Sequence, residues 1–215
     1  MSDRHAAAMD RAAFLRRGAA AALAAGAGSL VAAPGSQAAA PVRPSGEDIG
    51  FLQWGATAEL VSIAFYDRAL RASTGWGAQA FTRAERTRLK LTRASDADHL
   101  RRLRYTLAGD APKRDDFTIV LPDAPFNSRR GVLELGARLE RLIAGVYLDG
   151  VTNATDPGTR ALLGRLLASE SQHISALEVL AGAPATTGLL APVYPEAAGA
   201  ALDAYVRPGA SAPRP

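Results

Sequence analysis

The chain has 215 residues, 48% of them hydrophobic, which is enough apolar surface to bury the core of one domain. It contains no cysteine, so disulfides, iron–sulfur clusters and thiol nucleophiles are excluded, and a metal site would have to use Asp, Glu or His. Half of the net charge of +4 comes from residues 1–40, which hold four Arg and two Asp, and aromatic residues make up only 6%. We expect no nucleic-acid partner, because such proteins concentrate positive charge on one face.

The first forty residues have the order of an export signal. Arg11, Arg16 and Arg17 precede an uncharged stretch over residues 18–33, and small residues suited to cleavage follow at 36–40. The uncharged stretch is shorter than the about 20 residues of a membrane span, so no stable span is expected after cleavage. The arginines resemble a twin-arginine translocation signal, which predicts a mature protein in the periplasm or the extracellular cell envelope. The alternative is an amphipathic helix retained in a cytoplasmic protein.

Helix-favouring composition and end signals predict four long helices in the rest of the chain, over residues 46–71, 82–107, 131–152 and 157–180. Thr82, with Glu85 three residues later, has the pattern of a helix N-terminus. Pro157 suits a first helical turn, and Gly182 suits a C-terminal cap.

Between the second and third helices lies a segment without helical period, residues 110–129. It contains three prolines and an apolar run at 117–121 that suits a short extended piece. Helix, helix, long connection, helix, helix predicts an all-α fold, a four-helix bundle with one long crossover between helices two and three. We expect the bundle to span residues 41–182. An Ala-, Gly- and Pro-rich tail follows at 183–215, with one short helix near residues 196–205.

The core stripes of the first and third helices repeat each other at a constant offset, and each contains a glutamate. Glu59 and Glu140 occupy the same place in the two matching stripes. A tyrosine follows each glutamate by seven positions, at Tyr66 and Tyr147. Because an isolated carboxylate in a core is costly, both glutamates are expected to meet something positive.

The second and fourth helices each carry an acid-x-x-His pair on their apolar stripe. The pairs are Asp96 with His99 and Glu170 with His173, again related by one common offset, and no other histidine follows the signal segment. A spacing of three places the acid and the imidazole on one helical face. Two glutamate helices and two acid-x-x-His helices therefore place six polar side chains on faces where a core should be apolar.

In sequence order this cluster resembles the dinuclear carboxylate proteins of the ferritin-like superfamily. The resemblance implies a site for two divalent metal ions, with iron expected and manganese as the alternative, held by Glu59, Asp96, His99, Glu140, Glu170 and His173. It also implies that Tyr66 and Tyr147 hydrogen-bond a ligand carboxylate or act as redox-active phenols; otherwise they are core aromatics. Asp96 departs from the usual glutamate and is one methylene shorter, so that either a bridging role is lost or its helix lies closer.

The expected function is that of an exported ferritin-like protein whose metal centre reacts with dioxygen or peroxide, as a ferroxidase or a peroxide-consuming oxidoreductase. The alternatives are an enzyme resembling manganese catalase and a non-catalytic envelope protein similar to the ferritin-like desiccation-related proteins, with a vestigial site. A homo-oligomer is compatible with each. Met1 and Met9 are the only methionines and lie in the signal segment, so no methionine-ligated haem is expected.

Overall fold

The computed structural model describes residues 44, 46–184 and 188–209. The export signal expected at residues 1–40 and the end of the tail lie outside these described residues. The four expected helices are present, with ends within a few residues of those predicted: α2 (Gly46–Ala72), α3 (Arg83–Leu107), α4 (Arg129–Asn153) and α5 (Pro157–Leu180).

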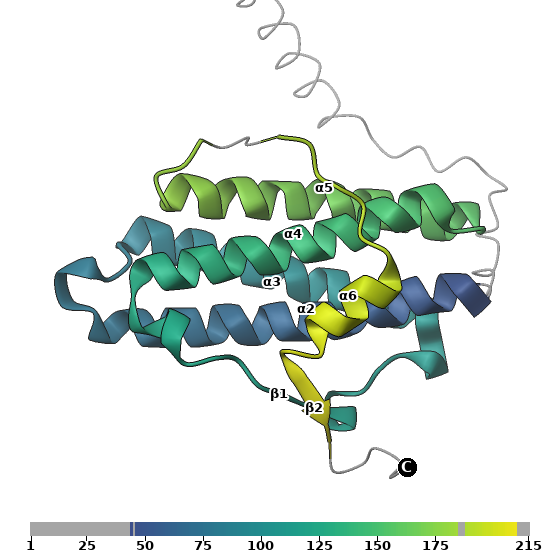
Figure 1. Ribbon diagram of the computed structural model, residues 1–215, viewed down its shortest axis with the longest axis horizontal. Helices are drawn as coiled ribbons and strands as arrows, with labels where there is room; N and C mark the ends of the chain where they lie inside the picture. The colour runs from purple at the N-terminus through teal and green to yellow at the C-terminus, as the bar shows by residue number, and fades with distance from the viewer. Residues whose placement is uncertain (1–43, 45, 185–187, 210–215) are drawn as a thin grey trace, which may run out of the picture. The chain divides into compact units, whose positions relative to one another are not determined.

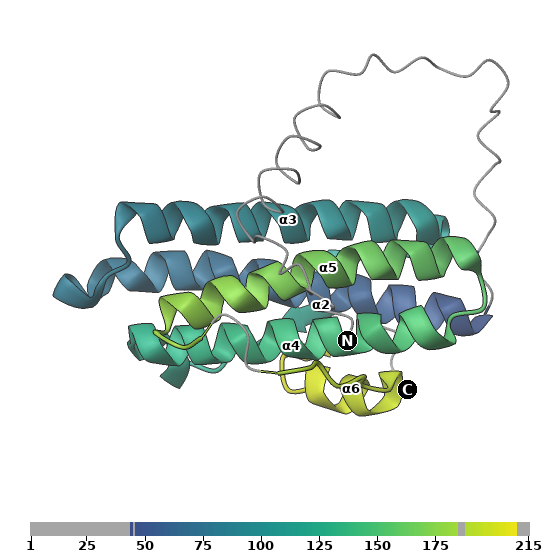
Figure 2. The same ribbon diagram turned by 90° about the horizontal axis from the view of Figure 1, so that it is seen from above.

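The four helices pack side by side along their length, as the two views in Figures 1 and 2 show. Helix α2 pairs with α3, and α4 pairs with α5. Contacts between α2 and α4 and between α3 and α5 then join the two pairs. The all-α four-helix bundle with a long crossover between α3 and α4 is confirmed.

Short polar side chains start three of these helices. Thr82 and Glu85 form a reciprocal capping box at the start of α3. Ser128 accepts a hydrogen bond from the Gly131 amide at the start of α4, and Asp156 caps α5, in which Pro157 occupies the first turn. Each cap accepts an amide hydrogen bond that has no partner within the helix, which fixes where the helix begins.

The crossover and the tail meet on the outside of the bundle. The crossover contains a short strand, β1 (Phe117–Ile119), and the tail contains α6 (Pro195–Leu202) and a second strand, β2 (Val206–Pro208). The strands pair antiparallel, with Phe117 opposite Pro208. Helix α6 packs against α2 and α4, where it buries Ala198 and Leu202. Residues 188–209 of the tail therefore pack onto the bundle and the crossover, and β2 was not predicted from the sequence.

Leucines close the bundle core above and below its midpoint. Leu89 and Leu103 on α3, and Leu163 and Leu177 on α5, are at most 1% exposed. They lie along the helices on either side of the two acid-x-x-His pairs, so the predicted polar cluster is enclosed by apolar layers. In the described part of the chain, no helix has the length and hydropathy needed to cross a membrane.

Candidate metal centre

The four core stripes meet in the middle of the bundle and bring six predicted side chains together. The carboxylates are 0% exposed, and the two imidazoles are 5% and 6% exposed. Ligand atoms of these side chains form two overlapping groups, each with all its atoms within 4.8 Å of one another. The first group is Glu59, Asp96, His99 and Glu170; the second is Asp96, Glu140, Glu170 and His173.

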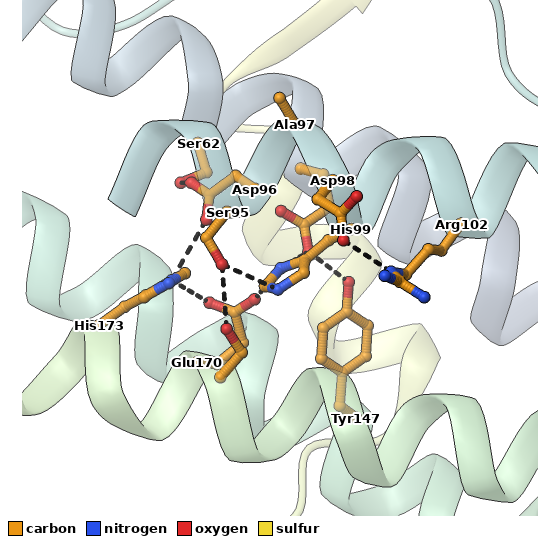
Figure 3. A network of polar contacts seen from close by, with 12 residues as sticks. Ser62, Ser95, Asp96, Ala97, Asp98, His99, Arg102, Tyr147, Glu170 and His173 are labelled. Carbon is orange, nitrogen blue, oxygen red and sulfur yellow. Dashed lines mark hydrogen bonds and ion pairs between the residues drawn. The ribbon is translucent and has the colours of Figure 1, made fainter. Parts of the chain in front are cut away.

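Glu170 and Asp96 belong to both groups. One carboxylate oxygen of Glu170 lies 2.7 Å from Nδ1 of His99, and the other lies 2.9 Å from Nδ1 of His173, as Figure 3 shows. Asp96 Oδ1 lies 3.2 Å from the same nitrogen of His173. The shorter side chain of Asp96 therefore still reaches the position shared by the two groups.

The two buried tyrosines hold the glutamates crosswise. The phenol of Tyr147 on α4 donates to Glu59 on α2 over 2.7 Å, and the phenol of Tyr66 on α2 donates to Glu140 on α4 over 2.5 Å. Burial, together with the neighbouring carboxylates, raises the pKa of both phenols well above the usual value, so both remain donors. Each tyrosine thus orients a carboxylate contributed by the other half of the chain.

Ser62 supports the shorter acid of the cluster. Its side chain is 1% exposed, and its hydroxyl donates to Asp96 Oδ2 over 2.7 Å. The same hydroxyl lies 3.3 Å from an oxygen of Glu140. The equivalent position in the second half is the apolar Ile143, three residues after Glu140 as Ser62 is three residues after Glu59. A serine therefore stands beside Asp96, whereas Glu170, which is one methylene longer, has no such partner in the repeat.

A glycine lies one turn before each glutamate and leaves room for an aromatic ring from the facing helix. A Cβ on Gly55 would lie 3.0 Å from Cε1 of Tyr147 and 3.1 Å from its hydroxyl oxygen. A Cβ on Gly136 would lie only 2.7 Å from the ring of Phe65. The missing side chain of Gly55 therefore allows Tyr147 to reach Glu59.

Burial and mutual repulsion govern the charges of the cluster. Burial, followed by the charge of Glu170, raises the pKa of Glu59 from 4.5 to about 7, and burial also raises the pKa of Asp96 to about 7. Burial by itself lowers the pKa of His99, but the neighbouring carboxylates of Glu170 and Glu59 outweigh it and raise that pKa to about 10. The pKa of His173 is raised against burial in the same way. At neutral pH the imidazoles therefore hold protons that a metal ion would have to displace.

Several buried atoms of the cluster make no well-directed hydrogen bond with the described residues. They are Glu59 Oε2, Asp96 Oδ1, His99 Nδ1, Glu140 Oε2 and Glu170 Oε1. Buried polar atoms are normally satisfied, and a set of unsatisfied oxygens beside an imidazole nitrogen has the donor types that iron and manganese accept in proteins. The residues present therefore fit a pair of divalent ions.

Comparison with known families agrees with this architecture. The family model of the ferritin-like domain matches residues 47–183, which is more than half of the chain. The chain belongs to the ferritin-like family. No curated protein matches it. In this ferritin-like protein the matched region begins in the first turn of α2 and ends just beyond α5, so it contains all six clustered side chains.

The structure also separates cluster residues from their surface neighbours. Asp98, next to His99 in sequence, points away from the cluster and pairs with Arg101 and Arg102 on the surface. Sequence reasoning missed Ser62, which has no polar counterpart in the other half of the ferritin-like bundle. It also missed Gly55 and its counterpart Gly136. Each precedes its glutamate by four positions, so the two glycines repeat at the same offset as the glutamates, and this signal could have identified them.

Proposed function

We propose that this protein is an exported ferritin-like protein that holds two divalent ions, iron with manganese as the alternative, and uses them to react with dioxygen or peroxide. The observation that carries the proposal is the set of buried carboxylate and imidazole atoms that face one another at the centre of the bundle, several of them without a well-directed hydrogen bond. The order of basic, apolar and small residues in segment 1–40 supports export.

The two overlapping groups suggest a role for each side chain. By group membership, Glu59 and His99 would hold one ion, Glu140 and His173 the other, and Asp96 and Glu170 would contact both. Four carboxylates offset the charge of two divalent ions, so that a loaded centre is nearly neutral within the apolar core. Bound iron would supply the electrons that reduce the oxidant. The tyrosines keep the glutamates in place, and the enclosing leucines limit the access of bulk water.

Metal analysis of the protein isolated from its native cell envelope tests this proposal. We expect two iron ions per chain in the envelope fraction, and a Glu170→Ala variant produced in the same way should contain no iron. Two manganese ions would favour an enzyme resembling manganese catalase. A metal-free protein that also fails to bind added Fe(II) would favour the non-catalytic envelope protein, and recovery from the cytoplasm alone would contradict export.

The contact between Ser62 and Asp96 makes a separate prediction about affinity. Replacing Ser62 with Ala leaves Asp96 Oδ2 without its buried donor, and loss of such an outer hydrogen bond typically weakens metal binding by about 10- to 100-fold. The longer side chain in the Ser62→Ala, Asp96→Glu double variant should recover much of that affinity. Calorimetric titration of the metal-free protein with Mn(II) measures both effects.

Ser175→Ala is the control for that titration, because the Ser175 hydroxyl donates to the backbone oxygen of Ser171 on the same helix and not to the cluster. Equal affinities for Ser62→Ala and the unmodified protein would show that Asp96 is held without the serine. A double variant weaker than Ser62→Ala would show that the glutamate does not fit this position.

A further inference from the structure

The six clustered side chains are not equally shielded from solvent. Every carboxylate is 0% exposed, whereas His99 is 5% and His173 is 6% exposed. On the α2 and α4 side, Ser62, Tyr66 and Tyr147 are at most 1% exposed and seal the cluster. The imidazoles on α3 and α5 therefore form the side of the cluster that lies nearest to solvent.

A hollow in the surface lies over this imidazole side. It has a volume of about 370 Å³ and is formed by α3 and α5, with Thr92, Ser95, Ser169, Gln172 and His173 among its lining residues. A larger hollow of about 910 Å³ on the outer face of α4 and α5 has none of the six cluster residues in its wall. The smaller hollow thus connects solvent to the cluster through His173.

Two serine hydroxyls line this hollow and connect it to His99. Ser95 Oγ lies 3.1 Å from Ser169 Oγ and 3.2 Å from Nε2 of His99. Figure 3 shows Ser95 and both imidazoles around the carboxylate of Glu170. Because Nδ1 of His99 faces the carboxylates, its Nε2 is free to bond the serine, which fixes the orientation of the ring.

The serine pair follows the internal repeat of the chain. Ser95 and Ser169 are related by the same offset as the two acid-x-x-His pairs, since each directly precedes the acid of its pair. Each lies four positions before the histidine and so shares its helical face. Leu89, Leu103, Leu163 and Leu177 are buried on either side of this level, whereas Ser95 and Ser169 are small and only partly buried, so the serines are the part of the α3–α5 contact that solvent reaches beside the cluster.

We propose that the Ser95–Ser169 hydroxyl pair is the entrance to the cluster, through which single metal ions and small neutral reactants pass between α3 and α5. This inference rests on the proposed metal site. A hydroxyl can donate and accept, so the pair can exchange its mutual hydrogen bond for one to a passing ion's water or to a peroxide molecule. The two hydroxyl oxygens lie 3.1 Å apart, so larger organic substrates would not pass between them.

The rate at which metal-free protein takes up Co(II), followed by stopped-flow absorbance, tests the entrance. In the Ser95→Val, Ser169→Val double variant, branched apolar side chains replace the hydroxyls. We expect uptake at least tenfold slower than in the unmodified protein, with two ions still bound at saturating Co(II). Ser171→Val is the matched control on α5, because the Ser171 hydroxyl donates to the Leu167 carbonyl of its own helix, and its uptake rate should be unchanged.

The charge beside the hollow provides an independent test, in which the uptake of Co(II) should become faster and not slower. Among the described residues, Arg88 is the one arginine in its wall and is exposed, so Arg88→Gln should speed the uptake of Co(II), most strongly at low salt. Lys90→Gln, an exposed change of equal charge outside this wall, should have little effect.

Unchanged uptake in both the valine and the Arg88 variants would overturn the entrance while leaving the metal site intact. Loss of occupancy at saturating Co(II) in the folded valine variant would also overturn it, by showing that the serines hold the site together. If the unmodified protein takes up no Co(II), Mn(II) or Fe(II), the proposed function itself fails. Far-UV circular dichroism establishes that each variant remains helical.

Discussion

Replacing Glu170 with Ala should abolish the binding of both ions, whereas replacing Glu59 with Ala should abolish one. Glu170 belongs to both groups of ligand atoms, and its two oxygens face different imidazoles. Glu59 belongs to one group only. Loss of an outer hydrogen bond typically weakens a metal site by up to about 100-fold, so the loss of a side chain that contacts the ion should weaken it further. The Glu59→Ala, Glu140→Ala double variant should again bind no metal.

Equilibrium dialysis against Mn(II), followed by metal analysis, measures the number of ions per chain. Glu134→Ala is the matched control, because Glu134 is an exposed residue of α4 that pairs with Arg130 on the surface, and this variant should retain two ions. One ion retained by Glu170→Ala, or full occupancy in the double variant, would contradict the shared arrangement. Each variant should stay helical, since removal of buried like charges can stabilise the metal-free bundle.

The metal-free protein should lose stability as the pH rises from about 4 to 10. The pKa values of Glu59 and Asp96 are about 7 in the folded protein, against 4.5 and 3.8 as ordinary values, and that of His99 is about 10 against 6.5. Across this window the folded chain binds more protons than the unfolded chain, so the free energy of unfolding falls with rising pH. Each unit of difference between the folded and unfolded pKa contributes about 1.4 kcal/mol, so the total fall amounts to several kcal/mol. Glu85, whose pKa is lowered to about 2 beside Arg129, acts in the opposite sense only at lower pH.

Bound metal should reverse this dependence. Metal ions compete with the protons of the cluster, so the affinity for metal rises with pH. Each ion at a free concentration 100 times its Kd contributes about 2.7 kcal/mol to the free energy of unfolding. For two ions this corresponds to an increase in Tm of roughly 10–20 °C. Urea unfolding at a series of pH values, with EDTA or with saturating Mn(II), measures both slopes.

The double variant Glu59→Gln, Asp96→Asn provides the control for the pH series. Without metal its free energy of unfolding should vary much less between pH 4 and 7, because two of the groups that titrate in this range are gone. Metal should no longer stabilise it. An equally steep slope in this variant would assign the pH dependence to groups outside the cluster.

Periodicity and repetition were sufficient to predict the bundle and its six clustered residues. One constant offset linked Glu59 to Glu140, and a second linked the two acid-x-x-His pairs, so that repetition within the chain predicted all four helix faces. The structure brings these faces together as expected. Ser95 and Ser169 are related by the second offset as well, so the same repetition also indicates these two serines.

Features that depend on contacts between distant segments were not predictable in this way. Ser62 has an apolar counterpart, Ile143, so repetition conceals its role; only the position of Asp96 on a neighbouring helix gives it a partner. Strand β2 has three residues and too little alternation to indicate a strand. It is defined by hydrogen bonds to β1 that exist only once the tail has reached the crossover.

The pairing of β1 with β2 also bears on the order in which the chain folds. Most helix contacts join neighbours along the sequence, within the α2–α3 and α4–α5 hairpins, and such local contacts form fast. Phe117 and Pro208, in contrast, are separated by two complete helices of the bundle and by α6. If so long a loop closed before α4 and α5 had packed, the chain would lose conformational entropy without gaining the contacts that offset this loss. We therefore expect the strand pair to form after the bundle has assembled, so its loss should speed unfolding more than it slows folding.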